Sequence, residues 1–136
     1  MRALEFREVR SADVNPLSAE AANLLNGGRI TIWICLDDSN QVGHCEGDRA
    51  TGEIIGLAVQ PGYRRRGVGT RLLQQVVDSL RGAGAKRIWL DAPNDPTIPA
   101  HGFYRALGWR ATGQFTGEHP YFGEILELPD HRAPGD

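Results

Sequence analysis

Apolar and polar residues alternate along this chain in the patterns of short strands and amphipathic helices. A period of two with β-branched or aromatic residues predicts a strand, and apolar positions three or four apart predict a helix. By these rules strands are predicted over residues 4–9, 29–36, 52–60, 87–92, 109–115 and 121–128, with a weaker strand over 41–46. Helices are predicted over residues 14–25, 68–80 and 99–107.

The order of these elements predicts the fold class. Residues 52–92 read strand–helix–strand, which predicts a parallel pair joined by a right-handed crossover, whereas both ends of the chain look antiparallel. We therefore expect an α+β (mixed α/β) fold around one central twisted mixed sheet. A chain of 136 residues fits one domain, expected over residues 1–130, with a frayed polar tail over 131–136.

Composition and charge narrow the class of function. The formal net charge of −2 gives no overall attraction to nucleic acid or to an anionic membrane, so neither is an expected partner. The charged N-terminus does not resemble a signal peptide, and no apolar run is long enough to span a membrane. Cys35 and Cys45 lack the spacing of metal ligands, so we expect free thiols, no metal and a cytoplasmic location.

The candidate chemistry lies in the turn between the strand over 52–60 and the helix that follows. Three adjacent arginines, Arg64 to Arg66, precede Gly67 and Gly69. Glycines let the backbone approach a ligand closely, and the first N–H groups of a helix attract anions. This turn is therefore a candidate phosphate-binding site. The alternative is an exposed basic turn whose glycines serve only its geometry.

Two other types of phosphate loop do not fit this turn. A P-loop requires Gly-Lys-Ser/Thr at its end, but Val68-Gly69 follows Gly67. A dinucleotide fingerprint requires a third glycine where Leu72 stands.

Two segments resemble signatures of the GCN5-related N-acetyltransferase (GNAT) superfamily. Residues 52–73, GEIIGLAVQPGYRRRGVGTRLL, are similar to its motif A, and residues 103–109, FYRALGW, are similar to the end of its motif B. The order of elements also matches over nearly the whole chain. The resemblance implies a sheet of about six to seven strands flanked by helices and splayed between the fourth and fifth strands.

The resemblance also implies a co-substrate, acetyl-CoA, and the residues that bind it. Backbone N–H groups of the turn would hold the coenzyme pyrophosphate, and the end of the strand, with a bulge there, would pair with the pantetheine arm. An N–H near Val59 would polarise the thioester carbonyl. The implied binding residues are Leu57, Ala58, Val59, Arg64, Arg65, Arg66, Gly67, Val68, Gly69, Thr70, Asn94, Phe103 and Tyr104.

The implied reaction is the transfer of an acetyl group to a primary amine of a small molecule or peptide, by direct attack through a tetrahedral intermediate. An alkyl ammonium is only about 0.04% neutral at pH 7, so a base must act before attack. Tyr104 stands at the family's acid position, although its ring alternatively serves only to pack the core. Glu53 matches the glutamate base of the histone-acetylating branch, although it alternatively faces solvent while a water chain does this work. Asp91, His101 and His119 are weaker candidates.

The sequence leaves open the pantetheine contact, the acceptor side and the type of function. Relatives place an Asn seven positions before the Tyr, where this chain has Thr97, so either Asn94 or Thr97 is expected to contact pantetheine. The short segment over residues 11–28 predicts an acceptor side that is open or completed by a partner chain, which leaves a homodimer open. A non-catalytic acyl-CoA sensor and a transferase of another acyl group are the alternative functions.

Overall fold

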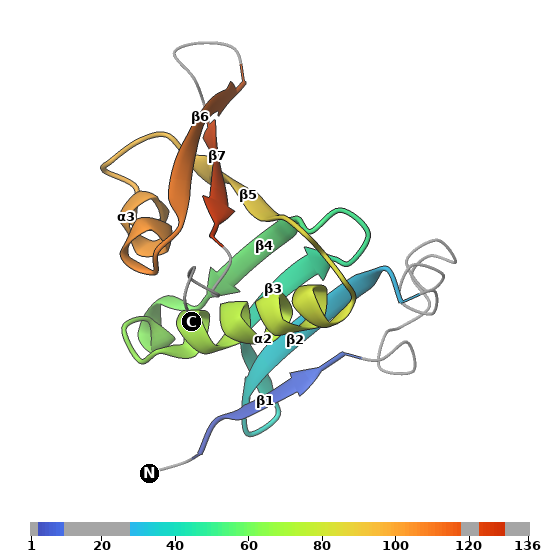
Figure 1. Cartoon of the computed structure of the whole chain (residues 1–136). Helices are drawn as coiled ribbons and strands as arrows, with labels where there is room; N and C mark the ends of the chain where they lie inside the picture. Colours follow the sequence, from blue (N-terminus) through green and yellow to red (C-terminus); the bar gives the residue numbers. More distant parts are fainter. Residues whose placement is uncertain (1–2, 10–27, 118–122, 130–136) are drawn as a thin grey trace, which may run out of the picture. The chain divides into compact units, whose positions relative to one another are not determined.

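The computed structural model describes residues 3–9, 28–117 and 123–129 of the chain. The chain divides into two compact units, Met1–Lys86 and Arg87–Asp136 (Figure 1). The helix expected over residues 14–25, the start of the last strand at Tyr121 and the tail over 131–136 lie outside the described residues.

The first unit is built on an antiparallel sheet with the strand order β1-β2-β3-β4. β2 pairs with β3 and β3 with β4 because short turns at 38–39 and 49–51 reverse the chain. β1 pairs with β2. A 3-10 turn, η2, leads from the sheet into helix α2. The elements are β1 Glu5–Glu8, β2 Ile30–Asp37, β3 Asn40–Asp48, β4 Ile54–Val59, η2 Pro61–Tyr63 and α2 Val68–Gly82.

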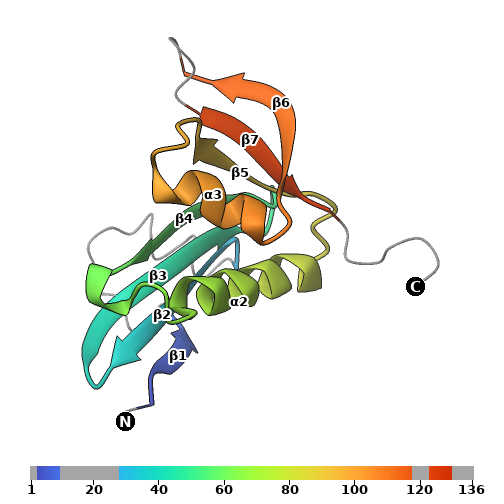
Figure 2. The ribbon, with the colours of Figure 1, turned by 90° about the vertical axis from the view of Figure 1, so that its left-hand side faces the viewer.

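Helix α2 lies across one face of this sheet, as Figure 1 and Figure 2 both show. Its apolar side is fully buried, at Val68, Leu72, Leu73, Val76, Val77 and Leu80. Two glycines on β3 allow this close approach. A Cβ added at Gly43 would lie 3.1 Å from Leu72 Cδ1, and one added at Gly47 would lie 2.5 Å from Val76 Cγ1.

The second unit has a three-stranded antiparallel sheet with the order β5-β7-β6, and helix α3 packs against β5. Leu90, Ala92 and Leu126 are buried there because alternate side chains of a strand share one face. Trp109 and Tyr104 complete this core. The elements are β5 Ile88–Pro93, α3 Pro99–Ala106, β6 Arg110–Thr116 and β7 Gly123–Leu128.

The mixed α+β class expected from the sequence is confirmed, with two corrections. The strand predicted as weak over 41–46 extends over Asn40–Asp48, because glycines that depress its strand propensity are needed where α2 packs. The expected parallel pair is not formed: β4 and β5 belong to separate sheets, and every registered pair of described strands is antiparallel. Strand–helix–strand order implies a parallel pair only when both strands enter one sheet.

The number of sheets, the number of domains and the absence of a membrane span were also predicted from the sequence. The strands appear as a four-stranded and a three-stranded sheet in place of one continuous sheet. A single domain over residues 1–130 stays a prediction. Within the described ranges, no helix combines the length and apolar character required to cross a membrane.

Candidate functional site

The turn before α2 presents a run of backbone donors. Arg65 and Gly67 adopt left-handed backbone angles, with φ of 63° and 79°. The first N–H to bond back to this turn is that of Arg71, which donates to the Gly67 carbonyl at 3.0 Å. The N–H groups of residues 65–70 find no acceptor among the described residues. Successive donors in such a turn form a concave anion site, and the first turn of α2 carries no acidic side chain to repel an anion.

The three arginines of this turn differ in how the protein holds them. Arg64 Nε donates to the Val59 carbonyl at 3.3 Å. The Arg66 guanidinium lies 5.2 Å from the centre of the Tyr63 ring, within cation–π range. The exposed Arg65 side chain makes no hydrogen bond or ion pair with the described part of the chain. Its charge is therefore available to a ligand without the loss of a protein contact.

Tyr63 was not predicted from the sequence as part of the site. Its hydroxyl donates to the Asp37 carboxylate at the end of β2, while its ring supports the Arg66 guanidinium. Tyr63 therefore ties the turn to the sheet. The position of Tyr63 directly before the arginines could have indicated a role in this turn. Its partner Asp37 could not be predicted, because it is distant in sequence.

Among the described strands β4 pairs with β3 alone, so the other edge of β4 has no strand partner there. The Gln60 N–H donates to the Val42 carbonyl on β3 at 2.8 Å. Since backbone groups of successive strand residues point to opposite edges, those of Val59 and Leu57 point away from β3. An extended ligand can therefore add to this edge as a further strand.

The bulge expected near the end of β4 lies earlier in the strand. Ile54 pairs with Gly47 and Gly56 pairs with Glu46, so Ile55 is the extra residue. Its side chain is 47% exposed, as expected for a residue that leaves the ladder. Leu57, Ala58 and Val59, where the bulge was expected, keep regular pairing with β3.

Glu53 lies at the opposite end of β4 from the turn. Its backbone N–H donates to Thr51 Oγ1 at 3.3 Å, and its carbonyl accepts the Asp48 N–H at 2.9 Å. The residue is half-buried. These contacts fix its backbone within the hairpin between β3 and β4, and its expected role as a base stays a prediction.

Tyr104 is the buried residue of α3 in the second unit. It is 9% exposed, and its ring meets those of Phe103 and Trp109 edge-on, at centroid distances of 5.2 and 5.9 Å. The Tyr104 carbonyl accepts the N–H groups of Leu107 and Trp109, both at 3.1 Å. The ring thus has the packing role considered from the sequence, and the acid role of its hydroxyl stays a prediction.

The two candidates for a pantetheine contact, Asn94 and Thr97, follow β5 and have different surroundings. The Thr97 hydroxyl donates to Asp95 Oδ1 at 2.7 Å, and the Thr97 N–H donates to the same oxygen at 2.9 Å. These bonds lower the pKa of Asp95 and occupy the Thr97 donor. The half-buried side chain of Asn94 makes no such bond with the described residues. Which of the two residues contacts pantetheine stays a prediction.

Two of the weaker catalytic candidates make hydrogen bonds within the fold. Both oxygens of Asp91 lie 2.9 Å from the Thr116 hydroxyl on β6. The His101 carbonyl accepts a hydrogen bond from Arg105, and His119 lies outside the described residues.

The two cysteines are free, as expected from the sequence, and the structure shows that both are buried. Burial raises the pKa of Cys45 to about 12, with a smaller contribution from the charge of Glu46. Burial likewise raises the pKa of Cys35. Both thiols are therefore less ionised at neutral pH than an exposed cysteine. In the described ranges no three His, Cys, Asp or Glu side chains gather as a metal site would require.

Comparison with known proteins places these features in a family context. The family model described as "Acetyltransferase (GNAT) family" matches residues 3–109. An uncharacterized N-acetyltransferase of Mycobacterium tuberculosis is 31% identical over 107 residues, which cover 76% of this chain and 68% of that protein. Both matches include the turn before α2.

Solved structures share the fold. The PaiA N-acetyltransferase of Thermoplasma acidophilum, solved with coenzyme A, matches with a TM-score of 0.72 at 15% identity, over 93% of this chain and 99% of its own. A GNAT acetyltransferase of Elizabethkingia anophelis, solved with acetyl-CoA, matches with a TM-score of 0.65 at 15% identity, over 92% and 97%. At these identities the likeness shows a common fold.

Proposed function

Because this chain belongs to the acetyltransferase (GNAT) family, we propose that it transfers an acetyl group from acetyl-CoA to a primary amine of a small molecule or peptide. The observation that carries this proposal is the run of N–H groups over residues 65–70 without acceptors among the described residues. These donors suit a diphosphate, which accepts several hydrogen bonds at once. The Arg65 side chain adds a positive charge beside them.

The edge of β4 would orient the rest of the coenzyme. The backbone groups of Leu57 and Val59 that point away from β3 would pair with the amides of the pantetheine arm. The Val59 N–H would then donate to the thioester carbonyl oxygen as it gains negative charge. One such donor is worth roughly 3 kcal/mol in the transition state. Asn94 and Phe103 complete the proposed binding residues.

Two side chains are proposed for general acid–base catalysis. The amine nitrogen forms a bond to the carbonyl carbon and loses a proton, either to Glu53 or to water. The bond from that carbon to sulfur then breaks, and the Tyr104 hydroxyl donates a proton to the leaving thiolate. General acid catalysis of this kind contributes typically about 10²- to 10⁴-fold to a rate.

Binding and turnover are measured separately to test this proposal. We expect acetyl-CoA to bind by calorimetry and raise the melting temperature, and an amine panel to give free thiol with at least one member. We expect Tyr104→Phe to lower kcat by about 100-fold while the KM for acetyl-CoA stays within about twofold. Binding without thiol release from any amine would support a non-catalytic sensor. A faster reaction with succinyl- or propionyl-CoA would show that the acyl donor is not acetyl-CoA. If no coenzyme A species binds, the proposal is refuted. The cytoplasmic location and the homodimer stay predictions.

A further inference from the structure

Glu124 is a buried carboxylate on the core face of β7. It is 7% exposed, and it shares this face with Leu126, while its register partner on β5 is the buried Ala92. A carboxylate in such surroundings is costly unless other groups satisfy it. Its partners therefore reveal what it does in the fold.

The two oxygens of Glu124 bind two different elements. Oε1 accepts a hydrogen bond from Arg105 Nη2 of α3 at 3.0 Å, and Oε2 accepts the Gly113 N–H of β6 at 3.3 Å. Arg105 Nη1 also donates to the His101 carbonyl at 2.8 Å, which holds its side chain against its own helix. One carboxylate thus joins β7, β6 and α3.

Strand β6 bulges opposite Glu124. Ala111 pairs with Leu126 and Phe115 with Glu124, so residues 112–114 face only one residue of β7. The Thr112 hydroxyl donates to the carbonyl of that residue at 2.7 Å, and the Glu124 carboxylate receives the Gly113 N–H. Side chains therefore replace the ladder bonds that the bulge removes.

Helix α3 depends on such tertiary contacts. It has eight residues, no side-chain hydrogen bond at its N-cap, and Gly102 in its interior. A helix this short is unstable by itself, and an internal glycine weakens it further. The contact between Arg105 and Glu124 joins α3 to the sheet at the residue next to Tyr104.

We infer that Glu124, acting through Arg105, is a positioning residue that sets the direction of the Tyr104 side chain. This inference rests on the proposed function. A helix with its side chains has a radius of roughly 5–6 Å, so a helix rotation of about 20° moves the end of a side chain by roughly 2 Å. Displacements of about 1 Å can lower a rate by about 100-fold.

The test is a double-mutant cycle in kcat between Glu124→Gln and Tyr104→Phe. Glu124→Gln is expected to lower kcat at least about 10-fold with little change in the KM for acetyl-CoA. In the Tyr104→Phe background the same change is expected to have no further effect, because the group that it positions is gone. A purely structural role would instead lower the fraction of active enzyme equally in both backgrounds.

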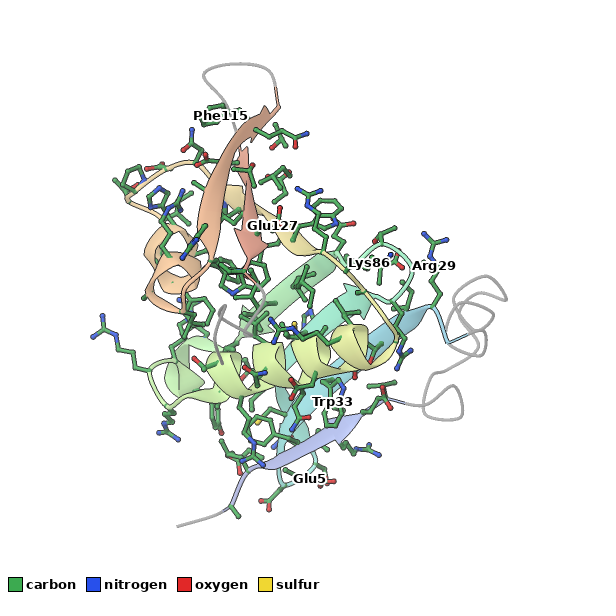
Figure 3. All side chains as sticks on the ribbon, viewed as in Figure 1. Glu5, Arg29, Trp33, Lys86, Phe115 and Glu127 are labelled. Carbon is green, nitrogen blue, oxygen red and sulfur yellow. The ribbon has the colours of Figure 1, made fainter. Side chains whose placement is uncertain are left out.

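The matched control is Glu127→Gln on the same strand. Glu127, labelled in Figure 3, accepts a hydrogen bond from Arg87 at 2.8 Å, and both side chains of this pair are more than 40% exposed. This pair joins β7 to the residue directly before β5 and does not involve α3, so its loss is expected to leave kcat unchanged. Should Glu124→Gln fail to fold, Arg105→Lys tests the same contact, since it keeps the charge but not the fork of donors.

A readout that does not depend on turnover separates this inference from the proposed function. Ring signals of Tyr104 in NMR spectra are expected to show faster ring flipping in folded Glu124→Gln than in the wild-type protein. An unchanged ring signal, or effects on kcat that add in the cycle, would overturn the inference. Absence of thiol release from the wild-type protein would instead refute the proposed function.

Discussion

Substitution of Gly67 tests the turn before α2 most directly. Gly67 has a φ of 79° at the N-cap of the helix, and a Cβ placed there meets no atom within 4 Å. Any larger side chain therefore strains the backbone and projects into open space beside the donors of residues 65–70. Gly67→Ala adds the strain, whereas Gly67→Trp adds the same strain together with bulk over the proposed diphosphate site.

The two effects have separable magnitudes. A non-glycine residue in the left-handed region costs roughly 1–2 kcal/mol, whichever side chain it carries. For a chain of this size that corresponds to a fall in melting temperature of about 4–8 °C. A hydrogen bond to a charged group is worth about 1.5–3 kcal/mol, so the loss of two main-chain donors to the diphosphate weakens binding by roughly 10²- to 10⁴-fold.

Calorimetric titration with acetyl-CoA and thermal unfolding measure the two quantities. Gly84 provides the control, because it has a φ of 93°, its added Cβ also meets nothing within 4 Å, and it follows the other end of α2. We expect Gly84→Ala and Gly84→Trp to lower the melting temperature as the Gly67 variants do, without any change in Kd. Only Gly67→Trp should lose detectable binding.

Two results would refute the role of these main-chain donors in coenzyme binding. If Gly67→Trp binds acetyl-CoA with the wild-type Kd while its melting temperature falls as expected, the coenzyme does not use these main-chain donors. If Gly84→Trp weakens binding as strongly, the loss reflects the helix as a whole and not the turn.

Three further predictions concern other contacts in the first unit. Tyr63→Phe removes the hydrogen bond to Asp37 but keeps the ring under the arginine, so the Kd for acetyl-CoA should rise about threefold to 30-fold by calorimetry, and an unchanged Kd would count against this anchoring. The hydrogen bond from Arg29 lowers the pKa of Asp48, so this contact adds stability above the unfolded pKa near 3.9 and loses it as the pH falls through the lower folded value. Asp48→Asn should therefore lower the melting temperature at pH 7 and less at pH 3, whereas an equal loss at both would contradict the assignment. Cys45, whose pKa is raised to about 12, is roughly 0.01% ionised at pH 8, so thiol reagents should label it only after unfolding, as mass spectrometry would show.

Local signals in the sequence predicted most of the elements. Helix α2 begins at Val68 and ends at Gly82, as its apolar spacing and following glycines indicated. The limits of the described strands agree with the predictions to within about two residues, and β3 is longer than predicted at both ends. Glycines lower the strand propensity of β3, but they are needed there because α2 packs closely against this strand.

The candidate site was predicted unevenly for the same reason. Glycines and arginines adjacent in the chain announced the turn before α2, and the structure adds that its N–H groups lack acceptors among the described residues. The parallel pair and the place of the bulge were wrong, because both depend on which strands meet and in which register. The apolar–polar alternation of a strand predicts that it is a strand, but does not predict which distant strand it pairs with.

The sequence by itself determined the turn, the helix behind it and the family to which they point, since backbone angles and helix ends depend on neighbouring residues. Only the tertiary structure decided that Tyr63 bonds Asp37, 26 residues away, and that Arg105 of α3 meets Glu124, 19 residues away. A buried charge must find its partner wherever the fold places one, and that partner is defined by packing in space.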